Sequence, residues 1–371
     1  MWKIWKEEIY KIASRKIIWC GILVLLAFLT FRLWTIQQDY AVTIDGQTYY
    51  GKTAIRKDQE LAKEYAGPLT EEKVRAIYDR FGFYYYDEKI DNFRGNFCNK
   101  YITEKMTNYR QLSGDNPDEI QFMEGEEWEN NAAPLLKGDV QFDYVYGWDD
   151  MVETYGITMM LMLSVILIIG LSPVFAEEYT LRTADILLTT RRGKKSAIWM
   201  KISAAVFFTA AVYCLASLYI WLAYRYVFGT QGLDASTVLC GALPYHGTYP
   251  KEIGAFFVFI FVLGVAGIIL LSAVVLAVSA ICRNSFMAVV VSMIVFVIPV
   301  AWIKIFSPMW ILGRKGTMLV NHFMLSQPVY LPLGWGFSFP EDVTVMHLLI
   351  ALTVTVVCIT AGYHKYRNYQ G

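Results

Sequence analysis

Apolar residues in this chain are concentrated in six runs, each long enough to cross a bilayer core, which needs about 20 helical residues. The runs are Ile17–Ile36, Thr154–Ala176, Ile198–Phe228, Ile253–Ile281, Phe286–Phe306 and Val343–Tyr363. Composition agrees with this pattern, because 56% of the residues are hydrophobic and only 18% are charged. The sequence therefore predicts an α-helical polytopic membrane protein with six transmembrane helices.

The short stretches around these runs complete the membrane-embedded part. Residues 1–16 place several apolar side chains on one helical stripe, namely Trp2, Trp5, Ile9, Ile12 and Ala13. That stripe is typical of a cytosolic helix lying in the membrane interface, and it fits an extension of the first span equally well. The remaining stretches are a charged loop at 177–197, loops at 229–252 and 307–342, a turn at 282–285 and a tail at 364–371.

Residues 37–150 form the one long polar region. Alternating residues flank Asp45-Gly46, a pair typical of a hairpin turn, and helix start and stop signals follow at Thr70 and Gly82. We therefore expect a small α+β domain inserted between spans 1 and 2.

Charge is distributed unevenly although the chain as a whole is neutral, with 33 basic and 33 acidic residues. Residues 37–150 contain 13 Lys and Arg against 23 Asp and Glu, so the remainder has 20 against 10. Basic residues in short loops favour the cytoplasmic side. This asymmetry predicts cytoplasmic termini and an extracellular domain at 37–150. The loop at 307–342 is apolar, so it is predicted to be extracellular or re-entrant.

Two features of the extracellular side need separate interpretation. Cys98 and Cys240 both fall outside, where a disulfide is permitted, and two free thiols remain the alternative. Residues 46–53 match the phosphate-binding pattern G-x-x-x-x-G-K-[ST] at Gly46, Gly51, Lys52 and Thr53. Because the intervening Tyr49 and Tyr50 fit a hairpin strand better than an anion-binding loop, we interpret this match as chance.

Ionisable residues are missing from the middle of the six runs, and their absence argues against two classes of membrane protein. Arg32, Arg225, Lys304 and His347 lie near predicted outer ends. Ion-coupled carriers and intramembrane proteases need charged or metal-binding groups at mid-depth. The four histidines are scattered, so we expect no metal site. We also expect no catalytic residues and no cofactor in this chain, and nothing indicates nucleic-acid binding.

The charged loop at 177–197 carries the most specific pattern in the chain. It begins with the acidic pair Glu177-Glu178, continues through Leu187-Leu188 and a basic cluster, and leads to Lys201 in the next span. This layout resembles the cytoplasmic coupling loop in the membrane subunit, or permease, of type-two ABC exporters. The chain has Arg182 where that family often has Gly, and Arg191 where it often has Pro.

The resemblance implies a permease that forms a homo- or heterodimer in the lipid bilayer of a bacterial plasma membrane. It would couple to separate ABC ATPase subunits that hold ATP and magnesium. The residues expected to dock the ATPase are Glu177, Glu178, Thr183, Asp185, Leu187, Leu188, Arg192 and Arg283. An antimicrobial peptide, a lipid-like molecule or a drug would each suit such an exporter. A receptor or scaffold that transports nothing, with an extracellular binding domain, is the alternative.

Overall fold

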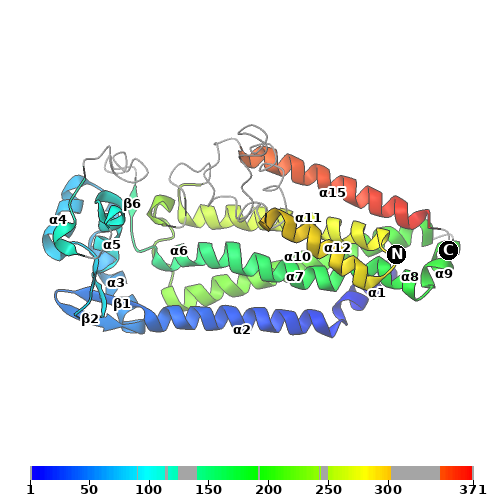
Figure 1. Cartoon of the computed structure of the whole chain (residues 1–371), viewed down its shortest axis with the longest axis horizontal. Helices are drawn as coiled ribbons and strands as arrows, with labels where there is room; N and C mark the ends of the chain where they lie inside the picture. Colours follow the sequence, from blue (N-terminus) through cyan, green and yellow to red (C-terminus); the bar gives the residue numbers. More distant parts are fainter. Residues whose placement is uncertain are drawn as a thin grey trace.

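The computed structural model describes residues 2–89, 91–112, 116–123, 140–190, 193–241, 243, 250–301 and 343–369. They form an elongated bundle of long helices with a smaller unit of helices and strands at one end (Figure 1). Five helical segments are long and apolar enough to cross a membrane: Lys16–Asp39, Met160–Thr180, Gly193–Phe228, Ile253–Ile281 and His347–Arg367. The helical membrane-protein class is thus supported by five of the six predicted spans.

The predicted fifth span is only partly described. Its helix, α12 (Ser285–Ala301), has 17 residues, about 25 Å at 1.5 Å per residue, which is shorter than a bilayer core. The predicted loop at 307–342 lies outside the described residues.

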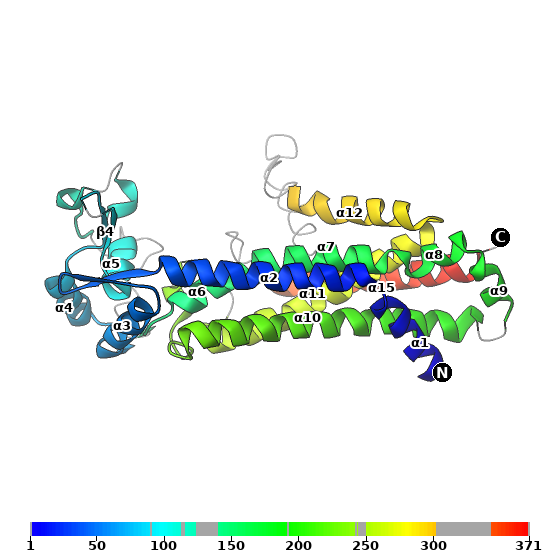
Figure 2. The ribbon, with the colours of Figure 1, turned by 90° about the horizontal axis from the view of Figure 1, so that it is seen from below.

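Helix α11 (Ile253–Ile281) lies at the centre of the bundle. It packs against α7 (Met160–Leu171), α8 (Pro173–Thr180), α10 (Ile198–Phe228), α12 and α15 (Val343–Arg367). Helix α2 (Lys16–Asp39) packs on α7 and α10, and the short α1 (Trp2–Ala13) packs on α10. Figure 2 shows α1 running obliquely away from the other helices beside α10. The apolar stripe of α1 therefore faces a neighbouring helix to a large extent.

A proline divides the second span into α7 and α8. Pro173 has no backbone N–H and cannot continue the helix regularly, so backbone groups near it need other partners in an apolar environment. Ser279 of α11 supplies them. Its hydroxyl accepts from the N–H groups of Phe175 and Ala176, at 3.0 and 3.1 Å, and donates to the carbonyl of Ser172 at 2.6 Å. Helix α8 is thereby fixed to α11 at its first turn.

The α+β unit follows α2 and is made by the described residues between 40 and 144. Its helices are α3 (Gly51–Glu64), α4 (Glu71–Phe81) and α5 (Phe97–Met106), with 3₁₀ turns η1 (Tyr109–Gln111) and η2 (Pro117–Glu119). Three antiparallel pairs join β1 (Ala41–Ile44) to β2 (Gln47–Tyr50), β3 (Gly67–Pro68) to β6 (Gln141–Phe142), and β4 (Tyr85–Asp87) to β5 (Asn92–Arg94).

Residues 46–53 run from the turn of the first hairpin through β2 into the start of α3. Asp45 and Gly46 both have positive φ, 48° and 81°, as the tight hairpin turn requires. The next four residues form β2, whose backbone pairs with β1. The Lys52 ammonium lies over the ring of Tyr226, 5.8 Å from its centre.

Hydrogen bonds attach the α+β unit to the bundle. The Gln231 side chain donates to the Gln59 carbonyl at 3.0 Å and to the Asp143 carboxylate at 2.7 Å. Arg32 of α2 forms an ion pair with Asp150 of α6 (Tyr146–Glu153) at 2.9 Å. Arg32, which was expected near the end of a span, is therefore also paired with a carboxylate.

Candidate functional site

The predicted coupling loop lies at the end of the bundle opposite the α+β unit (Figures 1 and 2). It consists of the end of α8, the short helix α9 (Thr183–Thr189) and the π-helical turn η6 (Gly193–Ala197), which leads into α10. We call residues 177–197 the coupling segment. Arg192 lies outside the described residues.

A buried ion pair joins the two ends of the coupling segment. The Lys201 ammonium, on α10, donates to the carboxylate of Glu178 on α8 and to the Val174 carbonyl at 3.4 Å. Lys201 is 3% exposed, and Glu178 is also buried. Because a buried charge without a partner is costly, this pair constrains how far α8 and α10 can separate.

A second carboxylate reaches the same lysine from α1. Glu8 lies 3.4 Å from the Lys201 ammonium and 2.9 Å from the ammonium of Lys11 on its own helix. Burial opposes the charge on Lys11, yet the hydrogen bond and charge of Glu8 raise the pKa of Lys11. The Tyr366 hydroxyl of α15 donates to Glu178. We call Glu8, Glu178, Lys201 and Tyr366 the buried junction, and it joins α1, α8, α10 and α15.

A more exposed ion pair lies beside the buried junction. Arg15, between α1 and α2, binds the Glu177 carboxylate at 2.7 Å and also donates to the Gly170 carbonyl. The two residues of the predicted acidic pair thus have different partners. Glu177 contacts the N-terminal part of the chain, and Glu178 contacts Lys201.

Helix α9 begins after a residue in a left-handed conformation. Arg182 has φ 55°, a value that glycine adopts without steric cost. It follows Leu181, the residue that caps α8. This position is the usual one for glycine after a helix end, and it turns the chain from α8 into α9.

The apolar residues in and before α9 are divided by the fold. Ala184 and Leu188 are buried, and Leu187 is partly buried. Leu181, in the turn before α9, is exposed, and Ile186 is 71% exposed. The exposed surface of α9 and of the turn before it is made by Leu181, Arg182, Thr183, Asp185, Ile186 and Thr189.

The turn at 282–285, which carries the predicted docking residue Arg283, lies next to the coupling segment. The Tyr179 hydroxyl donates to the Ala280 carbonyl at 3.0 Å, and the Thr180 hydroxyl to the Arg283 carbonyl at 3.4 Å. Arg283 is exposed, with its guanidinium 5.9 Å from the ring centre of Tyr369. The structure thus brings Arg283 and the exposed residues of α9 to the same end of the bundle.

The two cysteines predicted to lie outside the membrane do not form a disulfide. Cys98, on α5, and Cys240, after η7 (Thr237–Leu239), are both free and buried. Burial raises the pKa of each thiol. Different carboxylates add to this effect: Asp58 further raises the pKa of Cys98, and Asp149 that of Cys240. Within the described ranges no group of His, Cys, Asp and Glu is arranged to hold a metal ion.

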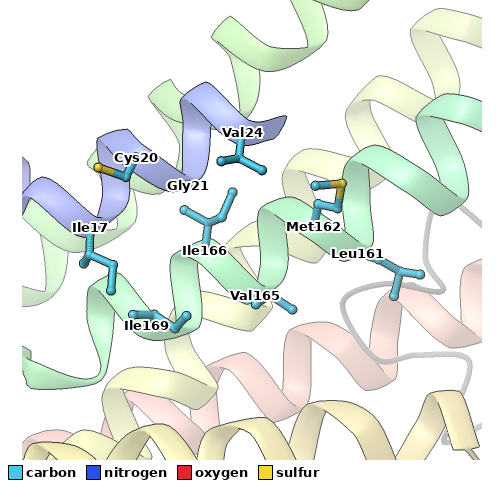
Figure 3. Close-up of a pocket in the computed structure, with 9 residues that line it drawn as sticks. All are labelled: Ile17, Cys20, Gly21, Val24, Leu161, Met162, Val165, Ile166 and Ile169. Carbon is cyan, nitrogen blue, oxygen red and sulfur yellow. The ribbon is translucent and has the colours of Figure 1, made fainter. Parts of the chain in front are cut away.

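An apolar groove of about 440 Å³ lies between α2 and α7 (Figure 3). Gly21 permits the close packing at its centre, because a Cβ there would lie 2.8 Å from Ile166. The groove is lined by Ile17, Cys20, Gly21, Val24, Leu161, Met162, Val165, Ile166 and Ile169. None of these side chains is charged or carries a strong hydrogen-bonding group, so nothing here would orient a polar substrate.

Sequence reasoning identified the ends of this site but missed two of its members. Glu8 and Tyr366 belong to the buried junction, and neither was singled out. A signal for Glu8 exists, since it falls among Trp5, Ile9 and Ile12 on the packed side of α1. Tyr366 offers no comparable pattern. Comparison of the chain with protein-family models, curated proteins and solved structures gave no match.

Proposed function

We propose that this chain is the permease subunit of an ATP-driven exporter, with the coupling segment as the docking site of a separate ABC ATPase. In this proposal both termini and the coupling segment lie in the cytoplasm of a bacterial cell, and the α+β unit lies outside the plasma membrane. The permease works as a dimer, and ATP and magnesium belong to the ATPase.

One observation carries the proposal. The coupling segment is fixed where it joins α8 and α10, which we call its root, and it is exposed on α9, which we call its tip. Glu178 and Lys201 join its two flanking helices through buried charges. Further along, Ile186 and its neighbours on α9 are exposed. An exposed apolar residue on a rigidly attached helix is suited to receive force, because displacement of the tip must move the helices at the root.

The contacts at the root define the helices that would move. A push on α9 reaches α8 directly, and α8 is hydrogen-bonded to α11 through Ser279 and Tyr179. The same push reaches α10 through Lys201. Helix α10 is continuous over 31 residues, about 46 Å, and the α+β unit contacts the loop after it through Gln231. Binding outside and docking inside would thus act on one rigid helix.

The test is retention of the ATPase by the tagged protein purified from its host membranes. We expect a copurifying subunit whose own sequence carries a phosphate-binding loop and which hydrolyses ATP. Replacing Ile186 by Asp places a charge in the docking surface, and desolvating it costs several kcal/mol. We therefore expect the I186D variant to lose the ATPase while remaining inserted and folded.

Two control variants separate docking from folding. Tyr50→Asp changes an aromatic residue of comparable exposure, 60%, at the opposite end of the molecule, and it should retain the ATPase. Leu188→Ala alters the buried side of the same helix, so its main effect should be a loss of stability and not a direct loss of docking. If I186D retains both the ATPase and substrate-stimulated hydrolysis, the docking assignment is wrong. If no ATPase copurifies with the unmodified protein, the receptor or scaffold alternative is favoured.

A further inference from the structure

Helix α1 has two faces with different chemistry. The face toward α10 carries Trp5, whose ring centre lies 5.1 Å from that of Phe207, together with Glu8 and the buried Ile12. This face also positions Glu8 at Lys201. It accounts for most of the apolar stripe that the sequence shows, so that stripe is occupied by protein.

The rest of α1 is exposed and carries more basic than acidic side chains. Lys3, Lys6 and Tyr10 are exposed there, together with one carboxylate, Glu7. Trp2 is exposed at the edge of this surface, where its ring stacks on that of Trp5 and lies 5.4 Å from the Lys6 ammonium. In the described part of the chain no carboxylate forms an ion pair with Lys3 or Lys6. Two lysines with interfacial aromatic residues form a surface of the kind that attracts anionic lipid headgroups.

The position of α1 suits such a partner. It ends at Ala13, and the first span begins at Lys16, so the helix lies at the depth where a span leaves the bilayer. Exposed Lys16 extends the positive charge to that boundary. An anionic phospholipid would meet lysines and aromatic rings on one side of α1, while Glu8 on the other side contacts the root of the coupling segment.

We propose that the exposed face of α1 binds anionic phospholipid headgroups, and that this binding holds Glu8 against Lys201. The lipid thereby stabilises the buried junction that fixes α8 to α10. Glu8 is a positioning residue, since it acts through Lys201. The inference rests on the proposed function only for placing this end of the bundle at the cytoplasmic leaflet.

The experiment follows hydrogen exchange in the detergent-purified full-length protein during titration with phosphatidylglycerol, with phosphatidylcholine as the neutral comparison. We expect phosphatidylglycerol alone to slow exchange in residues 2–13 and in 177–190. Each lysine near an anionic surface contributes roughly a fivefold factor in affinity. The variant K3Q/K6Q should therefore bind phosphatidylglycerol about 30-fold more weakly.

Further variants separate the lipid contact from its transmission. Glu8→Gln should keep the lipid-dependent protection of residues 2–13 and lose that of 177–190, and Glu8→Asp should restore part of the latter. K194Q/K195Q removes two exposed charges at the same end of the bundle but off α1, and should retain both effects.

The result that overturns lipid binding is equal protection by the two lipids, or unchanged affinity in K3Q/K6Q. Protection of 177–190 that persists in Glu8→Gln overturns the transmission through Glu8. No ATPase is present in this assay. A negative result in the lipid titration therefore says nothing about ATPase docking, which the I186D variant tests. Failure of the I186D test likewise leaves the lipid proposal standing.

Discussion

Replacing Lys201 by Met should be among the most damaging single changes outside the α+β unit. Methionine has a similar length and no charge, so the change removes the ammonium with little loss of volume. In the native protein this ammonium contacts both Glu178 and Glu8. In the variant, Glu178 keeps only the Tyr366 hydroxyl, and Glu8 keeps Lys11.

The expected cost follows from burial. Both glutamates are buried, and removing one partner of a buried ion pair typically costs about 3–5 kcal/mol, because the remaining charge is not compensated. Adding Glu178→Gln to Lys201→Met removes that charge, so the double variant should recover part of the loss. We expect a coupling energy of about 2–3 kcal/mol between the two positions.

The measurement is equilibrium unfolding of the detergent-purified protein, followed by tryptophan fluorescence, for the native chain, both single variants and the double variant. The matched control is the Glu71–Arg75 pair on α4, an ion pair at 2.6 Å whose side chains are 64% and 74% exposed. Exposed pairs of this spacing contribute about 0.3–0.5 kcal/mol. The reasoning is refuted if Lys201–Glu178 shows a coupling energy no larger than that of Glu71–Arg75.

Two further changes test local features by the same unfolding measurement. Burial raises the pKa of the Asp58 carboxyl from 3.8 to about 6, against hydrogen bonds from Tyr40 and the Phe97 N–H. The native state therefore binds this proton more tightly than the unfolded state, and the Asp58 contribution to stability falls as pH rises from about 4 to 6, by up to about 3 kcal/mol. Asp58→Asn should remove this loss, so its stability relative to the native chain should rise over that window. Arg182→Gly should raise the free energy of unfolding by about 1 kcal/mol, because glycine adopts φ 55° without steric cost.

Each of these two predictions has its own control. Asp79→Asn changes an exposed aspartate on α4 and should alter stability by no more than about 0.5 kcal/mol. A difference between Asp58→Asn and the native chain that stays constant with pH would contradict the first prediction. Arg182→Ala removes the same side chain but keeps a Cβ. The second prediction is wrong if the alanine variant is as stable as the glycine variant.

Hydrophobic patterning predicted most of the elements in the described part of the chain. Runs of about 20 apolar residues form helices because every backbone polar group in a bilayer must be paired within its own segment. The pair Asp45-Gly46 predicted a hairpin for a similarly local reason, since both residues tolerate positive φ. Such features depend on neighbours in sequence, so the sequence is sufficient to find them.

The buried junction could not be found in this way. Glu8, Glu178, Lys201 and Tyr366 are separated by many residues in the chain, and each one read alone fits an ordinary charged or interfacial position. Their contact depends on how α1, α8, α10 and α15 pack. Helical periodicity also could not decide which side of α9 would be covered, because its apolar residues occupy more than one side.

The sequence by itself thus determined that the chain forms helices long and apolar enough to cross a membrane, and where the segment 177–197 lies between two of them. Tertiary structure decided that Leu188 is buried while Ile186 is exposed, and that Lys201 joins two carboxylates from different helices. The physical reason is that transfer of a residue into an apolar phase depends on the residue itself. Pairing of a buried charge depends on which distant groups the fold brings within a few ångströms.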